Sequence, residues 1–161
     1  MLDLSLEQMI AAWERVRENE GCAGVDGITV EKYEHQAQSG LPELLAQACE
    51  GSYLPLPLRK LVVEKKSGSD ETRTLLIPVV RDRILQTAVA RLLSRSWEEE
   101  FLDASYGYRP DRGVDQAVAR ILQLRDRGWV HVLDADVTGY FDRVPYCPLV
   151  IEKVVAAHRL L

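Results

Sequence analysis

The chain has 161 residues, a net charge of −5 at pH 7 and 47% hydrophobic side chains, which permits one compact domain with a sizeable core. No apolar run approaches the length that crosses a bilayer, and no basic leader precedes an apolar core at the N-terminus. We therefore expect a cytoplasmic protein without membrane association. The three cysteines are odd in number and widely spaced, which argues against a disulfide framework or a zinc site.

The first third of the chain is predicted to be helical. Apolar residues at helical spacing indicate a helix over 6–17, which Ser5 can cap, and Thr29 can cap a second helix after a turn at 26–27. The Gly-Leu-Pro sequence at 40–42 is expected to interrupt the pattern before a further helix that ends at Gly51.

A β-hairpin and a long helix are predicted for the middle of the chain. Residues 56–64 alternate in polarity and read as a strand, 66–72 form a polar loop, and 73–77 form the return strand. Apolar residues at helical spacing then mark a long helix over 80–101. Residues 53–95 carry nine basic and four acidic side chains, so this part has a local basic excess that can contact phosphates. Taken alone, that excess is better explained by a solvated basic face.

The last third is predicted to contain a helix, a strand and a final helix. The first helix opens at Asp111 or Gly113 and ends at Gly128; the strand covers 130–137 and the last helix 149–161. The fold class is therefore α+β, with helices in the majority.

The predicted strand ends in a pair of carboxylates. Asp134 and Asp136 would share one face of it, and a turn with Gly139 follows. Mg²⁺ prefers one or two carboxylates and lets substrate phosphates complete its octahedron. A strand end with two solvated acids explains the spacing equally well.

Four blocks of the chain resemble reverse transcriptases of the group II intron maturase and bacterial retroelement type, including their CRISPR-associated relatives. Residues 136–142 are similar to the first catalytic palm motif of that family. The upstream blocks follow in the family's order, and the matched region covers roughly residues 10–155. They read Ala23-Gly24-Val25-Asp26-Gly27-Ile28-Thr29, Val62-Val63-Glu64-Lys65-Lys66-Ser67-Gly68 with Arg73-Thr74-Leu75-Leu76-Ile77-Pro78 and Asp82-Arg83-Ile84-Leu85-Gln86, and Ser105-Tyr106-Gly107-Tyr108-Arg109-Pro110 with Gln116-Ala117.

The resemblance implies the fingers and partial palm of a right-hand polymerase. Residues 1–128 would form the N-terminal block and fingers, with a β-hairpin, and 129–161 the start of the palm, with its first strand. The N-terminus is expected to be native and the palm to be cut short, because the family's Tyr-x-Asp-Asp hairpin has no counterpart in the sequence. Two-metal catalysis needs carboxylates on both sides of a metal pair about 3.5–4 Å apart. We therefore expect this chain alone to be inactive.

The resemblance also implies roles for single residues. Asp136 would be the catalytic carboxylate and would hold Mg²⁺ together with the backbone carbonyl of Val137. Lys65 and Arg73 would bind the triphosphate of the incoming deoxynucleotide, and Phe141 would exclude a 2′-hydroxyl. Without the resemblance, the two cations are ordinary flanks of a hairpin and the aromatic ring is a core residue.

Four further residues are weaker candidates. Arg109 and Tyr108 would contact the template strand, although the Tyr-Gly-Tyr sequence can equally pack the fingers against the palm. Asp134 and Lys66 rank second to their neighbours as metal and nucleotide ligands.

Two functions are therefore expected. The first is part of an RNA-directed DNA polymerase that uses an RNA template and primer, deoxynucleoside triphosphates and two Mg²⁺ ions, with a C-terminal half or adjacent domain supplied in trans. The alternative is a truncated, non-catalytic module for RNA binding or assembly. An open palm edge also predicts a homodimer.

Overall fold

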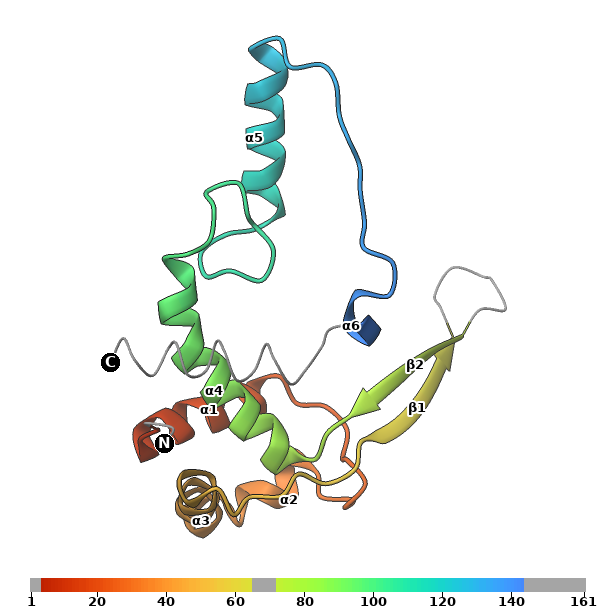
Figure 1. The fold of residues 1–161 in the computed structure, drawn as a ribbon. Coiled ribbons are helices and arrows are strands. Elements are labelled where there is room, and N and C mark those ends of the chain that lie inside the picture. The colour runs from red at the N-terminus through yellow and green to blue at the C-terminus, as the bar shows by residue number, and fades with distance from the viewer. Residues whose placement is uncertain (1–3, 65–71, 144–161) are drawn as a thin grey trace. The chain divides into compact units, whose positions relative to one another are not determined.

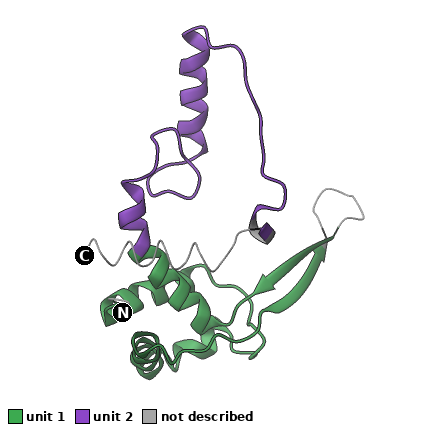
Figure 2. Cartoon of the chain, viewed as in Figure 1, with its two compact units in different colours: residues 1–92 green, residues 93–161 purple. Residues whose placement is uncertain are grey.

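The computed structural model describes residues 4–64 and 72–143. The chain divides into two compact units, residues 1–92 and 93–161, which Figure 2 shows in different colours. Figure 1 labels the elements, which are α1 (Leu6–Glu18), α2 (Val30–Glu34), α3 (Ala37–Glu50), β1 (Arg59–Glu64), β2 (Thr72–Ile77), α4 (Val80–Glu98), α5 (Val114–Asp126) and α6 (Tyr140–Arg143).

The first two helices begin where the sequence predicts. Ser5 caps α1: its Oγ accepts from the backbone N–H of Gln8 at 3.2 Å, and its own backbone N–H donates to Gln8 Oε1 at 2.8 Å. Thr29 caps α2 by accepting from the backbone N–H of Lys32 at 3.2 Å. Both caps satisfy backbone donors that have no partner inside the helix.

The first unit is built on one hydrophobic core. Each of α1 to α4 contributes one apolar face to it, and the rings of Trp13 and Tyr33 pack with their centroids 5.1 Å apart. The buried members are Leu4, Met9, Ala12, Trp13, Val16, Val30, Tyr33, Ala37, Leu41, Leu44, Val80, Ile84 and Ala88.

The predicted interruption at 40–42 is wrong, because α3 continues through Pro42. A proline inside a helix costs about 3 kcal/mol. Here the helix places Ala37, Leu41 and Leu44 on one face that is buried in the core, and burial of that face outweighs the local cost. The helix ends as predicted at Gly51, whose φ of 72° is the left-handed conformation that favours glycine.

The predicted hairpin is confirmed. β1 and β2 pair antiparallel, with Arg59 opposite Ile77 and Val63 opposite Arg73. β1 begins three residues later than expected because Pro57 has no N–H to donate to a ladder. The loop predicted over 66–72 falls mostly on residues 65–71, which lie outside the described part, and Thr72 belongs to β2.

Residues 129–137 of the second unit differ from the prediction. α5 begins after Gly113 as expected, but residues 129–137 form an irregular segment instead of the predicted strand. A strand needs a hydrogen-bonding neighbour, and the sheet in the described ranges contains β1 and β2 alone. Apolar side chains of the segment are therefore in solvent, with Val132 86% and Leu133 92% exposed. The helix predicted over 149–161 lies outside the described residues.

The observed mixture of helices with a two-stranded antiparallel sheet agrees with the predicted α+β class. Among residues 4–64 and 72–143, no helix combines the length and apolar character needed to cross a membrane.

Candidate nucleotide and metal site

Arg73 lies at the far end of the hairpin. It is the second residue of β2, it is exposed, and it stands opposite Val63 in the register. Lys65 and Lys66 belong to residues 65–71, which lie outside the described part of the chain. The described part of the predicted triphosphate site is therefore one guanidinium at the tip of a two-stranded arm. A guanidinium offers planar, paired donors that match phosphate oxygens.

The predicted metal ligands lie in the irregular segment of the second unit. Asp134 and Asp136 are both exposed, and the backbone turns after Val137 at Gly139, where φ is 61°. Within the described ranges, no three side chains of the His, Cys, Asp or Glu type come together as a metal site. A carboxylate of Asp136 and the carbonyl of Val137 are hard oxygen donors of the kind Mg²⁺ prefers, and most of its ligands would have to come from water and phosphate.

The two halves of the predicted site belong to different units. Arg73 is in residues 1–92, and Asp136 and Phe141, the latter in α6, are in residues 93–161. The structure describes each half within its own unit, and the assembly of the two halves into one nucleotide site stays a prediction.

The side chain of Arg109 is buried and makes its hydrogen bonds within the second unit. Only 8% of the residue is exposed, and its Nε and Nη2 donate to the same oxygen of Glu98 at 2.9 and 2.5 Å. Its Nη1 donates to the backbone oxygens of Leu102 and Ser105 at 2.7 and 3.0 Å, and its guanidinium carbon lies 5.1 Å from the ring centroid of Phe101. The hydrogen bond from Arg109 lowers the pKa of the Glu98 carboxyl. This geometry makes Arg109 a structural tie within its unit and does not support the predicted contact with template.

Tyr108, unlike Arg109, is exposed to solvent. Its side chain is fully exposed, and its φ of 57° is unusual for a residue other than glycine. Because the chain turns at this residue, Arg109 faces inward while the ring of Tyr108 stands in solvent. Nearby Tyr106 is held under Arg112, whose guanidinium carbon lies 5.8 Å from the ring centroid. Among the described residues, the exposed ring is free of contacts that would prevent stacking, and the predicted contact of Tyr108 with a template base stays a prediction.

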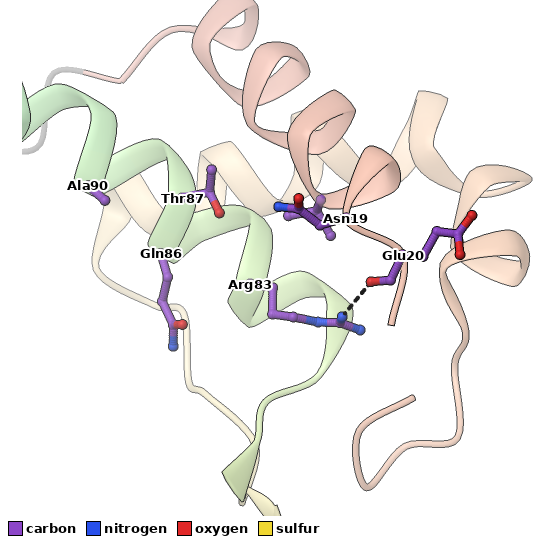
Figure 3. A pocket seen from close by; sticks show the side chains of 7 residues that line it. Asn19, Glu20, Arg83, Gln86, Thr87 and Ala90 are labelled. Atoms are coloured by element: carbon purple, nitrogen blue, oxygen red, sulfur yellow. Dashed lines mark hydrogen bonds between the residues drawn. The ribbon is translucent and has the colours of Figure 1, made fainter. Parts of the chain in front are cut away.

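Sequence reasoning missed the polar contacts at the root of the hairpin. Arg59 and Arg83 both donate to backbone carbonyls of the loop that follows α1. Beside this loop lies a hollow of about 330 Å³, and Figure 3 shows Arg83 reaching across its edge to the carbonyl of Glu20. The hollow is lined by Val16, Asn19, Glu20, Arg83, Gln86, Thr87 and Ala90. The signal available in the sequence was that Arg83 belongs to one matched block and that the loop leads into another, which begins at Ala23.

A second missed group lies where α4 begins. Tyr53 Oη donates to a carboxylate oxygen of Asp82, which is buried, and Arg81 Nη2 donates to Gln47 Oε1 at 2.7 Å. No local pattern indicates that a tyrosine from the loop after α3 would meet this helix.

Comparison with known proteins identifies relatives of the chain. No family model matches it. The chain is 37% identical over 125 residues to Protein YkfC of Escherichia coli K12, covering 75% of the chain and 32% of that protein. It is 29% identical over 140 residues to the group II intron-encoded protein LtrA of Lactococcus lactis, covering 86% of the chain and 23% of LtrA. An uncharacterized 91 kDa protein in the cob intron of Schizosaccharomyces pombe is 22% identical over 147 residues, covering 91% of the chain and 18% of its own length.

The chain thus spans about a third or less of the length of these curated relatives. The alignments with the two intron proteins each cover most of the chain, and they confirm the predicted relationship to the group II intron maturase and reverse transcriptase lineage.

Proposed function

Because the chain is related to the group II intron-encoded proteins, we propose that it forms the fingers and the first palm segment of an RNA-directed DNA polymerase. The observation that carries the proposal is the hairpin with Arg73 at its tip, which folds where the fingers block of the sequence predicts it. The segment with Asp136 follows in the chain order that the palm block requires. The reaction extends a primer on an RNA template with deoxynucleoside triphosphates.

The proposed roles follow from the chemistry of the side chains. Arg73, with Lys65, binds the triphosphate and offsets the negative charge that grows on the leaving pyrophosphate. Phe141 occupies the volume that a 2′-hydroxyl would need. Asp136 and the Val137 carbonyl are the ligands for Mg²⁺, which when bound supplies charge neutralisation at the reacting phosphate. Tyr108 stacks on a template base.

A second candidate function is a non-catalytic module that assembles with another chain. It is favoured by apolar surface in the second unit, because α5 buries none of its residues and the segment after it is exposed. The exposed apolar side chains include Val114, Val118, Ile121, Leu122, Trp129, Val130, Val132 and Leu133. Such a surface is typical of an interface. Its occupant is proposed to be a downstream palm half in trans or a second copy of this chain.

Primer extension on an RNA template with Mg²⁺ and deoxynucleotides tests the first proposal. It is measured for the chain alone and for the chain mixed with a downstream palm half taken from LtrA. Asp136→Asn is compared with Asp115→Asn, a matched change at an exposed acid on α5. Extension in the mixture that Asp136→Asn abolishes and Asp115→Asn preserves supports the polymerase. Extension that survives Asp136→Asn contradicts it.

Sedimentation of the chain alone tests the second proposal. A dimer that dissociates when Val118→Glu and Ile121→Glu are introduced supports assembly through α5. A monomer at all concentrations that also fails to bind RNA and the downstream half contradicts the module.

A further inference from the structure

The loop that follows α1 is fastened by two arginines from distant parts of the first unit. Arg83 of α4 donates from Nη1 to the backbone oxygen of Glu20 at 3.2 Å and from Nη2 to that of Cys22 at 3.0 Å. Arg59, the first residue of β1, donates from Nη1 to the oxygen of Ala23 at 3.0 Å. Residues 20–24, called the strap below, are thereby tied both to α4 and to the root of the hairpin.

Two glycines allow the strap to lie this close. A Cβ on Gly24 would stand 2.7 Å from Val79 Cα, and Val79 is a buried residue two positions after the end of β2. Gly21 has a φ of 105°, and a Cβ there would come within 3.0 Å of Arg83 Nη1. The strap therefore packs against the residues that follow β2 and contacts Arg59 where β1 begins. The close approaches at Gly21 and Gly24 depend on the absence of a side chain at these two positions.

The register places the fastened root and the proposed phosphate ligand on one face of the hairpin. Arg59 stands opposite Ile77 at the root, and Arg73 stands opposite Val63, four residues further along β1. Because side chains alternate along a strand, Arg59, Val63 and Arg73 share a face. At a rise of about 3.3 Å per residue, Arg73 lies roughly 13 Å beyond Arg59, so a tilt of about 10° at the root moves it by about 2 Å.

We propose that Arg59 and Arg83 are positioning residues for the incoming nucleotide. By tying the strap to the root of the hairpin, they fix the direction of the arm and so the place where Arg73 meets the triphosphate. This inference rests on the proposed function, in which Arg73 is the phosphate ligand. In this arrangement both residues act through the strap and not through the nucleotide, because Arg59 Nη1 and Arg83 Nη1 and Nη2 donate to its carbonyls.

Hydrogen exchange on the full 161-residue chain tests the fastening without any nucleotide. Arg59→Gln is expected to raise the exchange rates of the β1 and β2 amides and of the strap about tenfold, because loss of the hydrogen bond from Arg59 to Ala23 makes local opening at the root easier. Lys60→Gln is the matched control, since Lys60 is the adjacent exposed cation on the other face. Arg83→Lys, which keeps the charge but shortens the reach, is a second variant in case Arg59→Gln does not fold. Unchanged rates in both variants overturn the proposal.

A double-mutant cycle on binding of deoxythymidine triphosphate with Mg²⁺ tests the positioning itself. Arg59→Gln is expected to weaken binding about tenfold while Arg73 is present, and to have a clearly smaller effect in the Arg73→Gln background, where Lys65 is the remaining proposed ligand on the arm. Arg59→Lys, which retains a donor, is expected to recover much of the affinity. An equal loss in both backgrounds means that Arg59 acts on phosphate directly and overturns the inference.

Nucleotide binding by the unchanged chain separates the positioning role of Arg59 from the proposed function. If the unchanged chain binds the nucleotide and Arg59→Gln binds it equally well, the positioning role is wrong and the proposed function stands. If the unchanged chain and its complex with the downstream half both fail to bind it, the nucleotide site and the positioning role fall together.

Discussion

Replacing Tyr53 with phenylalanine isolates one buried polar contact at the start of α4. Tyr53 Oη donates to Asp82, whose exposed fraction is 3%, and the guanidinium carbon of Arg81 lies 5.7 Å from the centre of the Tyr53 ring. Burial, followed by the hydrogen bond to Asp82, raises the pKa of the Tyr53 hydroxyl above its ordinary value of 10.0. Tyr53→Phe keeps the ring and removes only the donor.

The expected cost follows from the charge and burial of the acceptor. A hydrogen bond to a charged group contributes about 1.5–3 kcal/mol, and a buried carboxylate that loses its donor cannot recover it from water. We expect Tyr53→Phe to lower the free energy of unfolding by about 2 kcal/mol. For a unit of this size the unfolding midpoint should fall by roughly 10 °C.

Urea unfolding followed by the fluorescence of Trp13 measures this change. Trp13 is buried in the core of the first unit, so Trp97→Phe and Trp129→Phe are introduced to remove the other two signals. Tyr108→Phe is the matched control, because that hydroxyl belongs to an exposed ring and its loss should change nothing. A Tyr53→Phe value within about 0.5 kcal/mol of the unchanged chain, with the same urea slope, would refute the reasoning.

The same contact predicts a dependence on alkaline pH. Because the pKa of Tyr53 is raised in the folded state, its contribution to stability is complete below pH 10.0 and is lost as the pH rises from there through the folded pKa. The stability difference between the unchanged chain and Tyr53→Phe should therefore shrink above that pH. A difference that stays constant would contradict the assignment.

Three further predictions concern the second unit and the strap. The hydrogen bond from Arg109 lowers the pKa of the Glu98 carboxyl, so the stability that this bond contributes is present above the ordinary pKa of 4.5 and is lost as the pH falls through the folded pKa. Thermal melts on both sides of that pH should show a loss of stability in acid that is absent in Glu98→Gln. Tyr108→Ala should weaken single-stranded RNA binding about tenfold in fluorescence anisotropy without lowering the melting temperature, and unchanged affinity would argue against stacking. Gly24→Ala should lower stability to urea by about 1–3 kcal/mol, whereas Gly107→Ala, where a Cβ meets nothing within 4 Å, should not; equal stabilities would contradict the close approach.

Local signals predicted much of the first unit. The caps at Ser5 and Thr29 and the alternation in the hairpin each act over a few residues, and all three are observed. The interruption at 40–42 was predicted wrongly because its outcome depends on the core. Proline disfavours a helix locally, but Leu41 and Leu44 are buried only if the helix continues, and the partners that bury them come from other helices.

Residues of the candidate site were predicted by type more reliably than by surroundings. The sequence marked Arg109 as a cation beside two tyrosines, and nothing local showed that Glu98, eleven residues earlier, would take two of its donors. Likewise, Arg59 was visible only as part of a basic excess, and Arg83 only as a member of a matched block. Whether an arginine faces a phosphate or a backbone carbonyl is decided by contacts far apart in the chain.

The irregular segment at 129–137 links folding to the proposed chemistry. Its alternating sequence suits a strand, but alternation provides only a face to bury, whereas the ladder that orders a strand requires a neighbour. Asp136 can hold a metal in a defined geometry only if the backbone on which it stands is held. Under the proposed function, a paired strand that carries further carboxylates would both complete the metal cage and order this segment. For this reason we expect catalytic competence and the pairing of residues 129–137 to appear together when a downstream half is supplied.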